Sequence, residues 1–140
     1  MLGQILYGAP VAEKIREQIQ AEMKALRVTP TLGIVSVGND SDYHSYRGQV
    51  TTLAKSVSIK VRSVIFTARS PSEHVVLGAI QQWNDDSSVH GIIVMRPAGT
   101  LPIALLIDAV AQEKDVEGVS NSSLCELLIY SQYMHLAPPI

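Results

Sequence analysis

Two short apolar runs constrain the fold of this chain more than any other feature. Thr31–Val37 reads TLGIVSV and Val89–Val94 reads VHGIIV, and neither run alternates regularly between apolar and polar residues. A strand of this kind has to be covered on both faces, which is typical of a parallel sheet packed between helices. We therefore expect a buried and largely parallel sheet.

Helical patterns separate these runs. Ala9–Leu26 places apolar side chains at steps of three and four, which predicts an amphipathic helix. The remaining expected elements are a helix over about 42–57, a strand over 59–67, a helix starting near Ser70-Pro71, and helices over 103–111 and 120–130. Strands that alternate with helices predict an α/β fold, here a three-layer α/β sandwich with a largely parallel sheet.

The composition excludes several classes of protein. Apolar residues make up 46% and charged residues 17% of the chain, as in globular domains. The net charge is −2 without a basic cluster, so we expect no nucleic-acid partner. No apolar run approaches the ~20 residues that span a bilayer, so we expect no membrane contact. The expected location is the cytoplasm, with the mitochondrion as the alternative.

The usual cofactor and metal motifs do not occur in the sequence. It contains neither G-x-G-x-x-G nor G-x-x-x-x-G-K-[ST], so no dinucleotide or nucleoside triphosphate cradle is expected. The four histidines are isolated from other potential ligands, and no metal site is expected: His44, His74, His90 and His135. Cys125 is the only cysteine, which excludes a disulfide within the chain.

Candidate ligand-binding residues lie in segments that follow the strands. In parallel sheets, ligands bind at the carboxyl ends of strands, where the segments 38–46, 95–102 and 114–118 should meet. Tyr43 and Tyr46 fall in the first turns of a helix, and half-buried packing is the alternative to ligand contact. Asp115 and Glu117 fall in the last segment, and ordinary turn chemistry is the alternative there.

Four motifs occur in a fixed order along the chain. They are Ile5–Gly8 with the helix after it, Pro30–Gly38 (PTLGIVSVG), Ser88–Val94 (SVHGIIV) and Glu113–Gly118 (EKDVEG). Together they resemble the N-terminal catalytic domain of the methylenetetrahydrofolate dehydrogenase/methenyltetrahydrofolate cyclohydrolase family. The resemblance implies a domain of this type over residues 1–136. It also implies that residues 137–140 begin a crossover to an NAD(P)-binding domain that this chain lacks, so NAD(P) would be a cofactor only with such a domain.

The central signature of that family is V-G-x-x-x-A-S-x-x-Y-V-x-x-K, and it aligns here without gaps from Val37 onward. Tyr46 falls on the family's tyrosine, which packs against the pterin and p-aminobenzoate portion of folate. Val50 stands at the position of the catalytic lysine. Tyr43 replaces the small serine of the signature.

A second group of differences lies in two loops. The family's Q-L-P-L-P loop reads Met95-Arg96-Pro97-Ala98-Gly99, so Met95 replaces the glutamine that hydrogen-bonds the lysine. Arg96 replaces leucine beside Pro97, and it could offer a cation to a carboxylate or glutamyl tail, or remain solvated. Glu117 replaces the aspartate that holds the polar edge of the pterin. These residues, with Tyr43 and Tyr46, form the expected folate site.

The resemblance implies a role in one-carbon metabolism, namely oxidation of 5,10-methylenetetrahydrofolate and hydrolysis of 5,10-methenyltetrahydrofolate. The family's lysine shuttles protons, and valine has no proton to offer. We therefore expect activity to be impaired or lost. The alternatives are a non-catalytic folate-binding or assembly module, or a truncated product of a longer folate enzyme. The apolar tail over 127–140 further predicts a homodimer or a partner chain.

Overall fold

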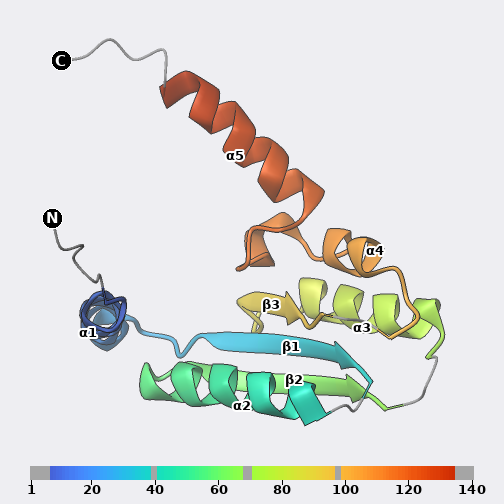
Figure 1. Ribbon diagram of the computed structural model, residues 1–140, viewed down its shortest axis with the longest axis horizontal. Coiled ribbons are helices and arrows are strands. Elements are labelled where there is room, and N and C mark those ends of the chain that lie inside the picture. The colour runs from blue at the N-terminus through green and yellow to red at the C-terminus, as the bar shows by residue number, and fades with distance from the viewer. Residues whose placement is uncertain (1–6, 39–40, 68–70, 97–98, 135–140) are drawn as a thin grey trace, which may run out of the picture.

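The computed structural model of the protein describes residues 7–38, 41–67, 71–96 and 99–134, with the backbone alone at 41–43 and 130–134 (Figure 1). Helices and strands alternate along the chain. In order, the elements are α1 (Ala9–Ala25), β1 (Thr31–Val37), α2 (Ser41–Ser56), β2 (Lys60–Phe66), α3 (Glu73–Asp85), β3 (Gly91–Val94), α4 (Ile103–Asp108), the 3-10 turn η1 (Gln112–Lys114) and α5 (Asn121–Met134).

The three described strands form one parallel sheet in the order β2-β1-β3. The central strand β1 is the TLGIVSV segment, and it is buried over nearly its whole length. An isolated parallel bridge between Ile92 and Asp115 joins the segment after η1 to the outer edge of β3. The expected α/β class with a parallel sheet is confirmed, and the buried central strand explains why its sequence lacks polar alternation.

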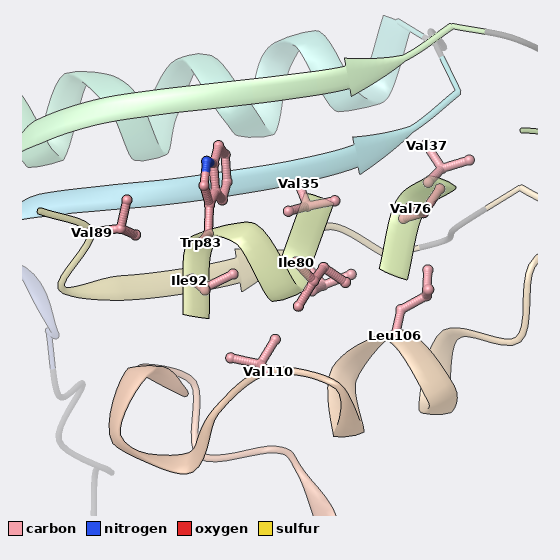
Figure 2. Packing of buried hydrophobic residues seen from close by; sticks show 10 residues of the cluster. Val35, Val37, Val76, Ile80, Trp83, Val89, Ile92, Leu106 and Val110 are labelled. Atoms are coloured by element: carbon pink, nitrogen blue, oxygen red, sulfur yellow. The ribbon is translucent and has the colours of Figure 1, made fainter. Parts of the chain in front are cut away.

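The sheet separates two groups of buried side chains, because successive residues of a strand point to opposite faces. Val35 and Val37 of β1 face α3 and α4, where they pack with the largest buried cluster (Figure 2). Ile34 points the other way and packs with Met95, Leu32, Val61 and the α2 residue Val50. Helices therefore cover both faces of the sheet, and α2 lies on the face that carries Met95.

One glycine of β1 is required by close packing. Trp83 of α3 points its ring toward the sheet (Figure 2), directly over Gly33. A Cβ atom at Gly33 would lie 2.6 Å from Cε3 of Trp83, well inside van der Waals contact. Because Gly33 has no side chain, the Trp83 ring can pack directly against the backbone of β1.

The helix boundaries correct two expectations. α4 ends at Asp108, before the expected end at position 111. α3 begins at Glu73, with Ser72 as its N-cap residue in an extended conformation and without a side-chain capping bond, so the start near Ser70-Pro71 was placed too early. Pro71 precedes the helix instead of occupying its first turn. Of the opening motif, Ile5 and Leu6 lie outside the described residues, and Gly8 is the N-cap residue of α1.

The first and last helices are the least covered parts of the structure. α1 buries none of its residues, and the described part of α5 extends away from the sheet with its side chains largely exposed (Figure 1). Within the described ranges, no helix has both the length and the apolar character needed to cross a membrane.

Candidate functional site

A cleft of about 280 Å³ lies where β3 ends. Its walls come from α2, from β3 with the residues that follow it, and from the loop after η1. The lining residues are Tyr46, Ile93, Val94, Met95, Arg96 and Glu117. Four of the residues that the sequence singled out are thus brought together at one edge of the sheet, as expected for a parallel α/β fold.

The inner wall of this cleft is apolar. The backbone amide of Met95 donates a 2.8 Å hydrogen bond to the carbonyl oxygen of Val35, which prolongs the sheet by one residue. The Met95 side chain is only 2% exposed and packs with Ile34. Val50 packs against this buried pair from α2. Among the described residues, the interior behind the cleft therefore offers methyl and thioether groups, and no group that exchanges a proton near neutral pH.

Val50 does not line the cleft itself. It lines a neighbouring cavity of about 540 Å³ between α1 and α2, whose other lining residues are nearly all apolar. Ile93 borders both spaces. The side chain of Tyr43, and Pro97 as a whole, lie outside the described residues, so their place relative to the cleft stays a prediction.

The loop that carries Glu117 is held in shape by Asp115. This carboxylate accepts hydrogen bonds from the amides of Gly118 (3.0 Å) and Ser120 (2.9 Å) and from the hydroxyl of Ser123 (2.8 Å). Partial burial disfavours its charge, but these hydrogen bonds outweigh that effect and lower the pKa of Asp115 to about 2. Turn chemistry thus accounts for Asp115, whereas Glu117 lines the cleft.

The start of the same loop is anchored by Lys114. Its ammonium group donates hydrogen bonds to the carbonyl oxygens of Trp83 (2.8 Å), Asn84 (2.7 Å) and Asp86 (2.9 Å) at the end of α3. A cation at this position satisfies carbonyl groups that a helix end leaves unpaired and complements the helix dipole. The sequence leaves turn chemistry open for Asp115, but it gives no sign that Lys114 anchors the loop, although both residues belong to the EKDVEG motif.

Arg96 and Glu117 face each other at the cleft. A guanidinium nitrogen of Arg96 lies 3.8 Å from a carboxylate oxygen of Glu117. The Arg96 side chain is 55% exposed, but that of Glu117 is only 23% exposed. The pair therefore sits at the boundary between the cleft and the solvent, with the carboxylate as the more enclosed partner.

The described residues do not fit a metal ion or a nicotinamide cofactor. No three His, Cys, Asp or Glu side chains are grouped as metal ligands in the part of the chain that the structure describes. The turns of these 140 residues lack the glycine-rich spacing that lets a backbone approach a pyrophosphate.

Known proteins with related sequences are folate enzymes. Residues 6–117 match the family model of the tetrahydrofolate dehydrogenase/cyclohydrolase catalytic domain. The bifunctional protein FolD of Geobacillus thermodenitrificans is 33% identical over 138 residues, which cover 92% of this chain and 46% of that protein. The chloroplastic FolD 4 of Arabidopsis thaliana is 36% identical over 122 residues, covering 81% and 33%. The chain thus spans about half or less of the length of these relatives.

Solved structures show the same fold. A 5,10-methylenetetrahydrofolate dehydrogenase from the silkworm Bombyx mori superposes with a TM-score of 0.84 and 28% identity, over 91% of this chain and 46% of that one. The FolD enzyme of Campylobacter jejuni superposes with a TM-score of 0.81 at 22% identity, over 87% and 44%. The family match over residues 6–117 and the identity to FolD proteins agree, and this chain belongs to the tetrahydrofolate dehydrogenase/cyclohydrolase family through its catalytic domain.

Proposed function

We propose that the cleft binds a reduced folate and that this chain does not perform the lysine-dependent cyclohydrolase reaction. The observation that carries the proposal is the packing of Val50 against the buried pair of Ile34 and Met95. A general acid or base has to present an ionisable group within reach of the substrate. At position 50 the chain presents the isopropyl group of Val50, and the buried side chain beside it, that of Met95, is a thioether.

The case for retained binding rests on the rest of the cleft. Tyr46 offers an aromatic ring, and Glu117 offers a carboxylate that can accept hydrogen bonds from ring N–H and amino groups. Ile93, Val94 and Met95 supply an apolar wall. A flat heteroaromatic ring with a polar edge, such as a pterin, has the complementary shape and chemistry.

The proposed location of the protein is the cytoplasm.

Two measurements on the purified chain test this proposal. Isothermal titration with tetrahydrofolate should give saturable binding that weakens in Glu117→Ala and in Tyr46→Ala. Hydrolysis of 5,10-methenyltetrahydrofolate, followed by absorbance, should proceed at the buffer rate. Turnover well above that rate would disprove the loss of chemistry, and the absence of saturable binding would remove folate from the proposal.

We propose further that the protein forms a homodimer through α5. Leu124, Leu127 and Ile129 are exposed on this helix, with Leu127 at 64% and Ile129 at 55%. Large apolar side chains gathered on one protruding helix are typical of an interaction surface. Light scattering should give twice the chain mass, and Leu127→Glu should shift it toward one chain mass. Val75→Glu, at an exposed position of α3, is the control that should leave the mass unchanged.

A further inference from the structure

We propose that Arg96 is a specificity-determining residue, which sets the net charge of the cleft to zero and so favours a neutral 2-amino-4-oxo pterin ring over a protonated 2,4-diamino ring. The inference rests on the proposed folate binding and concerns which ring chemistry that site accepts. It assigns to Arg96 a role on the ligand, distinct from that of a solvated side chain.

The charges of the cleft carry the first step. Among the described residues that line it, Arg96 and Glu117 are the only two that are charged at neutral pH, and the others are Tyr46, Ile93, Val94 and Met95. Because a guanidinium nitrogen lies 3.8 Å from Oε1 of Glu117, a ligand that contacts this oxygen also lies near the guanidinium. A ligand at this edge therefore experiences two opposite charges that largely offset each other.

The size of the effect follows from the distance. A cationic ring about 4 Å from a lone carboxylate would gain roughly fivefold in affinity where water screens the interaction, and more where screening is weaker. A guanidinium at a similar distance removes most of that gain. Without Arg96, the described lining of the cleft would carry a charge of −1 and would favour a protonated ring.

The hydrogen-bonding groups point in the same direction. A guanidinium can only donate hydrogen bonds, so it pairs with an acceptor such as a 4-oxo group. A 4-amino group on a protonated ring is itself a donor, and it would face Arg96 without an acceptor between them. The carboxylate of Glu117 serves the amino group at position 2 in either ring. Arg96 is thus the residue of this pair that distinguishes the two ligands.

The test compares two ligands that differ at one ring position. Dissociation constants for tetrahydrofolate and its 4-amino-4-deoxy analogue are measured by calorimetry, at a mildly acidic pH at which the diamino ring is protonated. The readout is the ratio of the two constants. We expect Arg96→Leu to shift this ratio toward the diamino ligand by about fivefold or more. The double variant Arg96→Leu/Glu117→Gln removes both charges, so its ratio should lie closer to that of the parent protein than the ratio of Arg96→Leu does.

Control variants separate charge from side-chain loss. Arg96→Lys keeps the cation and should keep the ratio, and Arg27→Leu, which removes an exposed arginine that does not line the cleft, should leave it unchanged. An unchanged ratio in Arg96→Leu overturns the inference. An equal loss of affinity for both ligands also overturns it, because Arg96 would then contact the shared glutamyl tail. Failure of both ligands to bind the parent protein would instead remove the proposed folate binding.

Discussion

The ammonium group of Lys114 lies 2.7 Å from the carbonyl oxygen of Asn84, in the last turn of α3. Two further carbonyl groups, those of Trp83 and Asp86, accept from the same ammonium. Lys114 thereby ties the loop that ends in Glu117 to the helix that carries the core tryptophan. The second position of the EKDVEG motif is thus a structural anchor.

Replacing Lys114 with methionine should therefore destabilise the fold. The side chain keeps most of its unbranched apolar stem but loses three charge-assisted hydrogen bonds, and we expect a loss of about 1–3 kcal/mol in the free energy of unfolding. Urea denaturation followed by circular dichroism measures it. Lys24→Met, at an exposed position of α1, is the control and should stay within about 0.5 kcal/mol of the parent protein. Equal effects of the two substitutions would contradict the anchoring role.

Gly33 and Gly78 should respond to alanine with opposite signs. At Gly33 the added methyl group meets the Trp83 ring at 2.6 Å, so overpacking should cost about 1–3 kcal/mol. At Gly78, inside α3, nothing lies within 4 Å of the added atom, and alanine should stabilise the helix by about 0.5–1 kcal/mol. The midpoint of urea unfolding should fall for Gly33→Ala and rise for Gly78→Ala. A fall in both would show that the contact with Trp83 is not what excludes a side chain.

The sequence predicted the fold well because β1 and β3 are buried on both faces. Thr31–Val37 was expected as a strand over the residues that form β1, since a β-rich apolar run can only be covered on both sides in a layered fold. The start of α3 was misplaced, because Pro71 fits the first turn of a helix by propensity, but the helix begins two residues later. Local preference predicts helix ends only to within about two residues.

The candidate site was predictable only in part. The positions of Tyr46, Met95, Arg96 and Glu117 at one sheet edge follow from the topology. The ion pair of Arg96 with Glu117 could not be predicted, because it joins two loops whose relative position depends on how Lys114 and Asp115 hold one of them. Equally, no pattern in the sequence shows that Val50 borders a separate apolar cavity between α1 and α2.

Asp115 should make stability depend on pH at the acid end. Its pKa in the folded chain is about 2, below the ~3.9 of an unfolded aspartate, so its contribution is present above about pH 4 and is lost as the pH falls toward 2. Asp115→Asn should therefore lower the free energy of unfolding by about 1–2 kcal/mol at neutral pH, after allowance for its partial exposure. The difference from the parent protein should shrink as the pH approaches 2.

The control for this prediction is Asp85→Asn, which alters an exposed carboxylate of α3 that a single amide, that of Gln81, contacts. Its effect on stability should be small throughout the same pH range. Thermal or urea unfolding at several pH values measures all three proteins. If the free energy of unfolding of Asp115→Asn stays below that of the parent protein by a constant amount down to pH 2, the hydrogen bonds of Asp115 do not depend on the charge of the carboxylate.

Restoring a lysine at position 50 should not by itself restore chemistry. Val50→Lys would place an ammonium beside the buried pair of Ile34 and Met95, which offers it no hydrogen-bond acceptor, so we expect no hydrolysis of 5,10-methenyltetrahydrofolate above the buffer rate. Met95→Gln alone should lower the free energy of unfolding by about 1–3 kcal/mol, because it buries an unsatisfied amide. In the double variant each new group provides a hydrogen-bond partner for the other. The loss of stability in the double variant should therefore be smaller than the sum of the losses in the two single variants, by about 1 kcal/mol or more. Urea unfolding of the four proteins measures this coupling energy and hydrolysis assays run in parallel. Strict additivity would mean that the two side chains do not meet, and turnover in Val50→Lys alone would show that Met95 does not limit the new amine.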